Sequence, residues 1–434
     1  MRSFIGVTVK APHLLKTRRF LPLFITQFLG AMNDNIIKQA LIVMIIFSLL
    51  DSSDMDPGIL VTIAAGIFIL PFFLFSATAG QIADKFEKSA SIQRIKFVEI
   101  LIMATACFGF YLSNTWFLIL VLFLMGTQSS FFGPLKYGIL PTHLKEGELI
   151  AGNALIEAGT FLAILIGTII GGLLIVIENG LVIISTILFL IALVGWTASR
   201  SIPTAAAADP NLKINYNILQ EIGRMVGRAR QTQTVFLSII GISWFWVVGA
   251  TFLSQFPNYS KTLLGGNASV VTLFMIVFSV GIGIGSYGCT KLLKGLISAK
   301  YVPLSAFALS AFITDLYFVS VNLSPPPDVL ITASDFLSSP TNLRILFDLA
   351  GISICGGLYT VPLYAILQND SDPTKRSRII AANNLLNALF MVFGAIVATG
   401  MLALDYTIPE VFLLLAIANC FIALYIMRLI PSRS

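Results

Sequence analysis

The sequence predicts an all-α membrane protein with twelve transmembrane helices in two pseudo-symmetric six-helix halves. Hydrophobic residues make up 57% of the 434 residues and charged residues only 11%, and the mean hydropathy is +0.91. A soluble domain carries about 25% charged residues, so a soluble globular protein is excluded. The apolar runs do not alternate with polar residues, as barrel strands do. A transmembrane β-barrel is therefore excluded as well.

Twelve apolar runs are long enough to cross a bilayer, whose core takes about 20 residues per helix. The first six lie at residues 20–50, 58–82, 95–112, 116–140, 150–177 and 181–199. The second six lie at residues 234–255, 268–290, 301–321, 343–368, 379–404 and 409–427. We therefore expect an N-terminal six-helix half at 1–199, a cytoplasmic linker at 200–233 and a C-terminal half at 234–434.

The two halves contain matching segments. The segment IAGNALIEAGTF from Ile150 matches IAANNLLNALFM from Ile380, and GPLKYGIL around Pro134 matches VPLYAIL around Pro362. Each pair has the same place in its half, from the fourth to the fifth span or from the tenth to the eleventh. A duplication with parallel halves is the architecture of major facilitator transporters, whose substrate site lies between the halves near the membrane midplane.

The basic residues predict that both termini are cytoplasmic. With this orientation the inner segments hold every lysine and arginine except Lys38, Lys261 and Arg344, and Lys96 is counted with the inner loop before the third span. The outer loops carry the acidic residues Asp51, Asp54, Asp56, Glu178, Asp328 and Asp335. Cytoplasmic loops of membrane proteins are rich in lysine and arginine. This asymmetry accounts for the net charge of +6, so no nucleic-acid surface is expected.

The linker is expected to contain one amphipathic helix. Asn217 followed by Gln220 is a helix-start pattern. The predicted apolar face holds Ile218, Ile222, Met225 and Val226, and the basic face holds Arg224, Arg228 and Arg230. Two interpretations fit this pattern: a helix on the anionic lipid surface of the inner leaflet, or a linker helix packed under the bundle.

The first span contains a polar group in QFLGAMNDNIIKQAL, formed by Asn33, Asp34, Asn35 and Lys38. At about 1.5 Å per residue, Asp34 lies about 21 Å into the helix, near the midplane. A charge there costs several kcal/mol, so such residues usually face a wet cavity and bind something. Asp34 precedes Lys38 by four residues, the spacing of an intrahelical ion pair. Substrate binding and a structural ion pair are the two alternatives.

The loop after the second span reads GQIADKFEK and contains Gly80, Asp84, Lys85 and Lys88. This spacing resembles the signature of the second-to-third loop of major facilitator proteins. We expect Asp84 to accept hydrogen bonds from the start of a neighbouring helix and Lys85 to bridge to an acidic residue. These contacts would latch the cytoplasmic side. A generic basic inner loop is the alternative.

Polar residues of the repeat form a second candidate group. Asn153 and Glu157 in the first half correspond to Asn383 and Asn387 in the second half. Asn384 is an additional asparagine in the second half. Asparagines at helical spacing either hydrogen-bond across helices or bind a ligand. Glu157 is ionisable and about 10 Å from the inner surface, which makes it a candidate coupling residue.

Tryptophans begin the seventh span, in SWFWVVGATFLSQFP. Trp244 and Trp246 are either interfacial anchors or an aromatic wall for an acyl chain or ring. The first half thus brings charge and the second half brings aromatic surface, an asymmetry that suits an amphiphilic substrate.

No enzyme, cofactor or metal site is expected. His13 and His143 are both predicted to be cytoplasmic, and no phosphate-binding glycine loop is present in the sequence. The cysteines are scattered through or beside apolar runs and are interpreted as packing residues: Cys107, Cys289, Cys355 and Cys420.

Several long segments resemble the lysophospholipid transporter family of the major facilitator superfamily, especially its forms fused to an acyltransferase and an acyl-carrier-protein synthetase. The resemblance runs through nearly all twelve spans. The segments that carry it most clearly are FLPLFITQFLGAMNDNIIKQAL, FFGPLKYGILPTHLKEGELIAGNALIEAGTFLAILIG, ISWFWVVGATFLSQFPNYSK and GGLYTVPLYAILQNDSDPTKRSRIIAANNLLNALFMV.

The resemblance implies a flippase of the bacterial inner membrane. Such proteins move lysophosphatidylethanolamine and lysophosphatidylglycerol from the outer to the inner leaflet, where a partner acyltransferase restores the second chain. We expect a monomer that works beside such an acyltransferase or synthetase. Two alternatives stay open: a proton-coupled exporter of amphipathic drugs that uses Asp34 or Glu157, and a non-transporting membrane scaffold for an acyltransferase.

Overall fold

A computed structural model describes residues 11–47, 57–323 and 330–429 of the chain. Twelve helices in these ranges are long and apolar enough to cross a membrane. This confirms the predicted fold class and shows a multi-pass membrane protein. The predicted outer residues Asp51, Asp54, Asp56 and Asp328 lie outside the described ranges.

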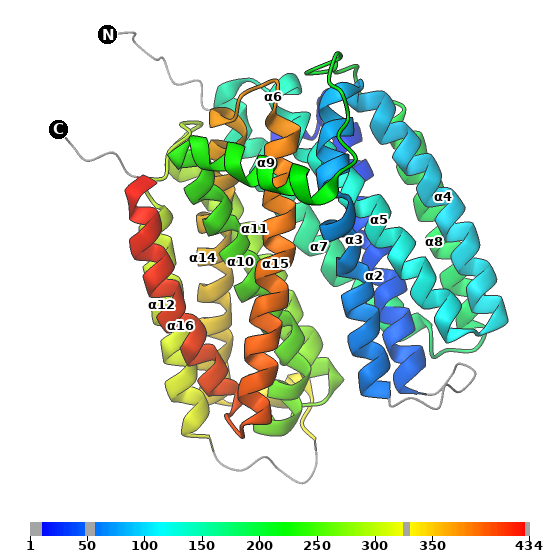
Figure 1. Ribbon diagram of the computed structural model, residues 1–434. Helices are drawn as coiled ribbons and strands as arrows, with labels where there is room; N and C mark the ends of the chain where they lie inside the picture. The colour runs from blue at the N-terminus through cyan, green and yellow to red at the C-terminus, as the bar shows by residue number, and fades with distance from the viewer. Residues whose placement is uncertain (1–10, 48–56, 324–329, 430–434) are drawn as a thin grey trace.

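The first six spans form one half of the molecule, drawn in blue to green in Figure 1. They are α2 (Leu21–Ile46), α3 (Pro57–Lys85), α4 (Lys88–Leu112), α5 (Thr115–Gly138), α7 (Leu149–Leu174) and α8 (Gly180–Ser199). Short elements accompany them: α1 (Ala11–Leu14), α6 (Leu140–His143) and a 3₁₀ turn (Glu146–Glu148).

The last six spans form the other half, drawn in green to red beside the first. They are α10 (Gln233–Asn258), α11 (Ala268–Leu293), α12 (Val302–Val321), α14 (Pro340–Asp370), α15 (Arg376–Ala403) and α16 (Ile408–Ile426). Short elements accompany them: a π-helical turn (Tyr259–Leu263), α13 (Ala333–Leu337) and a 3₁₀ turn (Met427–Leu429).

The predicted repeat occupies equivalent helices of the two halves. Pro134 lies inside α5 and Pro362 inside α14, the fourth span of each half. The matching segments that begin at Ile150 and Ile380 start near the beginning of α7 and of α15, the fifth span of each half. The halves are therefore built alike in the region where they meet.

The linker helix α9 (Ile218–Gln231) crosses one end of the bundle, which we name the α9 end (Figure 1). Asn217 caps it by accepting from the backbone N–H of Gln220 at 3.0 Å, as the sequence predicted. Met225 is fully buried and packs in one cluster with Ala77 of α3 and Ala381 of α15. This packing favours the linker helix under the bundle over the helix on a lipid surface.

Candidate functional site

The two halves are joined at the α9 end by Asp84, which is fully buried at the end of α3. Its carboxylate accepts from the backbone N–H of Ser377 at 3.0 Å, and from the backbone N–H and Nε of Arg378 at 3.3 and 2.9 Å. Ser377 and Arg378 lie in the first turn of α15. The predicted contact with a neighbouring helix start is present, and it runs from one half to the other. Its role in gating stays a prediction.

The other predicted residues of the GQIADKFEK loop, Gly80, Lys85 and Lys88, make different kinds of contact. A side chain on Gly80 would place its Cβ 2.7 Å from the Cβ of Ala381, so α3 and α15 approach closely only because this residue is glycine. Lys88 donates to the carbonyl oxygen of Ala83 at 3.1 Å. The predicted bridge from Lys85 to an acid is wrong for the described residues: Lys85 lies over the Phe86 ring, 5.8 Å from its centroid.

Other contacts between the halves also lie toward the α9 end. Asn153 of α7 and Gln368 of α14 exchange two amide hydrogen bonds of 2.8 and 3.0 Å. Tyr137 of α5 stacks on Tyr364 of α14 with ring centroids 4.4 Å apart. Within the described ranges, Asp84 and the amide pair contribute five hydrogen bonds between the two halves. The structure is thus closed at this end.

A buried polar network lies inside the first half, around Asp34. The Ser129 hydroxyl donates to Asp34 at 2.7 Å and lies 3.3 Å from Oε1 of Gln128. Gln128 donates to Glu99 at 2.9 Å, and Lys96 donates to the same carboxylate oxygen at 2.5 Å. Side chains from α2, α4 and α5 therefore form one cluster of neighbouring polar groups within the apolar bundle.

Lys96 and Glu99 are site residues that the sequence reasoning missed. Both are 1% exposed, and the assignment of Lys96 to an inner loop is wrong because it lies two turns inside α4. Gly30 of α2 leaves room for the ammonium, since a Cβ there would lie 2.2 Å from Nζ of Lys96. The signal was present in KFVEI, where two opposite charges stand three residues apart inside an apolar run.

The expected ion pair between Asp34 and Lys38 is not formed in the described structure. Oδ2 of Asp34 accepts from Ser129 instead, while Oδ1 is buried without a hydrogen-bond partner. Lys38 lies over the ring of Phe68, 5.7 Å from its centroid. Both side chains are half-buried, so each keeps unused capacity for a polar ligand. A buried polar atom without a partner is uncommon and calls for an explanation.

The asparagines beside Asp34 serve mainly the packing of the first half. Asn33 is fully buried and donates to Glu99 at 3.1 Å and to the carbonyl oxygen of Leu188 at 3.3 Å. Asn35 donates to the carbonyl oxygen of Ala31 in its own helix at 2.8 Å. Asn33 therefore joins α2 to α4 and α8, and Asn35 is satisfied within α2, whereas Asp34 and Lys38 remain available.

Glu157 belongs to a cluster where the halves touch. It is fully buried in α7 and accepts from the Tyr137 hydroxyl at 2.6 Å, while its second oxygen has no hydrogen-bond partner. Trp246 of the other half donates to the Tyr364 hydroxyl at 3.1 Å. The stacked tyrosines thus connect Glu157 to Trp246 across the interface.

The three repeat asparagines of α15 lie in different surroundings. Asn387 accepts from the Ser243 hydroxyl at 2.8 Å within its own half, as a residue that joins helices does. Asn384 packs across the interface, where a Cβ on Gly133 would lie 2.4 Å from its amide nitrogen. Asn383 is fully buried, and neither its amide nitrogen nor its amide oxygen has a hydrogen-bond partner among the described residues. It is the one with unused polar capacity.

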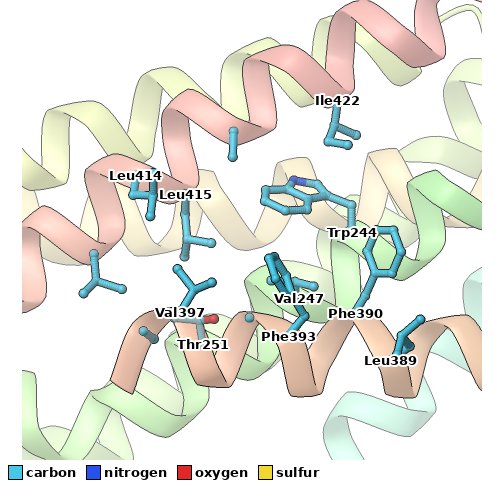
Figure 2. Close-up of a pocket in the computed structure, with 14 residues that line it drawn as sticks. Trp244, Val247, Thr251, Leu389, Phe390, Phe393, Val397, Leu414, Leu415 and Ile422 are labelled. Carbon is cyan, nitrogen blue, oxygen red and sulfur yellow. The ribbon is translucent and has the colours of Figure 1, made fainter. Parts of the chain in front are cut away.

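An apolar pocket of about 600 Å³ lies in the second half, between α10, α15 and α16. Figure 2 shows Trp244, Phe390, Val397 and Leu415 around this space, with Thr251 as a polar neighbour. Trp244 is the twelfth of the 26 residues of α10. This mid-helix place favours the aromatic wall over the interfacial anchor that the sequence left open. Its indole N–H donates to Asn419 at 2.8 Å.

Two six-helix halves that meet around buried polar side chains and are joined at one end define a membrane transporter. A sequence profile of the Major Facilitator Superfamily matches residues 23–395. The chain belongs to that superfamily.

Among curated proteins, the chain is similar to the lysophospholipid transporter LplT of Escherichia coli O1:K1 / APEC, with 26% identity over 351 residues, 79% of this chain and 78% of the relative. It is also similar to LplT of Citrobacter koseri, with 27% identity over 349 residues and the same coverage. The chain is an LplT-like member of the superfamily.

Solved structures support the same fold. The fucose:proton symporter FucP of E. coli superposes with a TM-score of 0.68 at 13% identity, covering 95% of this chain and 98% of the symporter. A bacterial homologue of the iron transporter ferroportin, solved in an outward-facing state, gives a TM-score of 0.65 at 13% identity, covering 94% of this chain and 99% of the homologue.

Proposed function

We propose that this transporter flips lysophospholipids, with lysophosphatidylethanolamine and lysophosphatidylglycerol as substrates, from the outer to the inner leaflet of the bacterial inner membrane. The observation that carries the proposal is the combination of two charged side chains without ion-pair partners in the first half and an apolar pocket in the second half. Asp34 and Lys38 have unused polar capacity in the first half, and the second half has an apolar pocket. The name of the LplT relatives supports the same substrate class.

The headgroup would bind beside α2. The Lys38 ammonium is a compact cation that suits the lipid phosphate, and the Asp34 carboxylate suits the ammonium of an ethanolamine headgroup. Lys96 and Glu99 already pair with each other, with Nζ and Oε2 2.5 Å apart, so they would support the packing of the first half around Asp34 without binding lipid themselves. Asn383 and Glu157 would add polar contacts from the interface.

The acyl chain would lie in the pocket between α10, α15 and α16. A volume of about 600 Å³ is within the range of small-molecule sites, about 300–1,000 Å³. Phe393 and Leu389, which line the pocket, are 68% and 49% exposed. The pocket therefore has an open side toward the outer surface of the bundle, and a long chain would protrude there into lipid.

Transport would proceed by alternating access, with the α9 end facing the cytoplasm as the basic residues predict. In that orientation the Asp84 contacts hold the cytoplasmic ends together in this structure. This is the state that would take substrate from the outer leaflet. Since one chain supplies both halves of the site, a monomer is sufficient for transport, and re-acylation would fall to a partner acyltransferase.

The test is the initial flipping rate of the two labelled lysolipids in liposomes with equal amounts of folded protein. We expect Asp34→Asn, Lys38→Gln and the double variant all to lose flipping of the ethanolamine lipid. Asp34→Asn should spare the glycerol lipid more, because that headgroup brings no ammonium. Glu178→Gln, at an exposed residue outside the site, serves as the matched control and should flip both lipids at the wild-type rate.

Two outcomes would overturn the proposal. Wild-type liposomes that move neither lipid faster than protein-free liposomes would exclude lysophospholipid transport. A double variant with wild-type rates would show that neither Asp34 nor Lys38 is needed to bind the headgroup. Headgroup binding would then have to be sought at Glu157.

A further inference from the structure

A second group of charged side chains lies in the C-terminal half, near the end of the bundle opposite α9. Arg344 of α14 donates to both carboxylate oxygens of Asp315 of α12, at 3.0 Å from Nε and 2.5 Å from the terminal nitrogen. The Arg344 and Asp315 side chains are 56% and 38% exposed. Neither residue takes part in the proposed lipid site.

Asp348 lies one turn after Arg344 on α14, so it shares the helix face from which Arg344 reaches Asp315 of α12. The carboxyl groups of Asp348 and Asp315 interact there. Asp348 is fully buried, and neither of its carboxylate oxygens has a hydrogen-bond partner. An ionised carboxylate buried without donors costs several kcal/mol even when one charge partner is nearby. A protonated carboxyl avoids that cost and brings a donor of its own.

The other titratable groups near Asp348 do not supply a donor. Tyr259, from the π-helical turn after α10, is hydrogen-bonded to Ser320 at 2.7 Å. Lys261 of the same turn is exposed. Asp335 of α13 is engaged at the start of its own helix, where it accepts from Thr332 at 2.7 and 2.9 Å. Among the described residues, Arg344 is the one cation that acts on Asp348, and it already holds Asp315.

We propose that Asp315 and Asp348 share one proton and form a proton-binding site at the end of the second half opposite α9. The Asp348 hydroxyl donates to the Asp315 carboxylate, so one negative charge remains for one arginine. Two carboxylates in contact cannot both be ionised cheaply. Release breaks the O–H bond of the pair and hands the proton to water at the exposed side of Asp315, and no electron moves.

This site goes beyond lipid transport and does not rest on it. In the proposed orientation it would meet the solution outside the cell, and deprotonation would place two carboxylates beside one arginine between α12 and α14. The proton therefore links the pH of that solution to the packing of these two helices.

Infrared difference spectroscopy on the purified full-length protein, without lysolipid, tests the proposal. We expect a protonated-carboxyl band that shifts in heavy water and disappears as the pH is raised. Asp348→Asn should remove this band, because an amide replaces the protonated acid and can still donate to Asp315. Asp315→Asn should shift the band, since it changes the acceptor. Asp372→Asn, at an exposed aspartate in an ion pair with Lys375, should leave it unchanged.

Thermal unfolding against pH provides a second readout. A folded protein that holds a proton which an unfolded aspartate releases must lose stability as the pH rises, until the folded protein releases it too. Asp348→Asn should remove that part of the pH dependence. If neither Asp348→Asn nor Asp315→Asn changes the carboxyl band, the pair holds no proton and the proposal is overturned. Failure of lipid flipping alone would leave this result untouched.

Discussion

Replacing Asp84 by asparagine should shift the transporter away from the state that is closed at the α9 end. Asp84 accepts three hydrogen bonds from the first turn of α15, two from backbone N–H groups and one from the Arg378 guanidinium. Asparagine keeps one acceptor oxygen but turns an N–H donor toward the others. The closed state loses this interaction and the open state does not, so the equilibrium between the two states must move.

The size of the shift follows from these contacts. A hydrogen bond to a charged group contributes about 1.5–3 kcal/mol, and Asp84→Asn removes at least one such bond. In the variant, Arg378 can still donate hydrogen bonds to Asp209 at 3.2 Å and to the carbonyl oxygen of Thr374 at 2.7 Å. The buried guanidinium therefore keeps hydrogen-bond partners. With a factor of ten for about 1.4 kcal/mol, the closed population relative to the open one should fall about 10- to 100-fold.

Electron paramagnetic resonance distances between spin labels at Lys145 and Asn369 measure the shift. Both residues are exposed at the α9 end and belong to different halves. Asp209→Asn is the matched control, because Asp209 is one-third exposed and such a pair contributes about 0–1 kcal/mol. It should leave the distances nearly unchanged. Distance distributions that are identical in wild type and Asp84→Asn would refute the latch.

Two further predictions use the same protein. Gly80→Ala should also open the α9 end in the spin-label assay, because its Cβ would lie 2.7 Å from that of Ala381, whereas Gly66→Ala meets nothing within 4 Å and should have no effect. In a cysteine-free background, a cysteine at exposed Ser334 should react with an impermeant reagent added to intact cells, and one at exposed Thr232 only after permeabilisation. The reverse pattern would overturn the orientation.

The spans and the Asp84 contact could be predicted because each is indicated by a short stretch of sequence. A run of apolar residues identifies a helix wherever it packs, and the duplicated segments around Ile150 and Ile380 identify equivalent helices. Asp84 could be predicted to accept hydrogen bonds from the start of another helix because the loop resembles a known signature. None of these inferences required us to identify the partner, which for Asp84 lies 293 residues away in sequence.

The errors came where a side chain had several partners within reach. The four-residue spacing permits an ion pair between Asp34 and Lys38, but Ser129 of α5 competes for the carboxylate. Lys96 was counted as a loop residue because the role of its partner Glu99 depends on burial, which a one-dimensional count does not contain. Tertiary contacts, rather than spacing, decide such pairs.

The linker between the halves is part of the packed core of the closed transporter and is not a flexible connection. Met225 of α9 is buried against Ala77 from one half and Ala381 from the other, and the chain before α9 is tied to α3 by two hydrogen bonds between Gln81 and Asn215, at 3.0 and 2.7 Å. When the halves rotate apart at this end, α9 must follow one of them and expose its apolar face toward the other. The length and the rigidity of this connection therefore help to set how often the transporter opens inward, and a cytoplasmic protein that covered the freed face of α9 would hold it open.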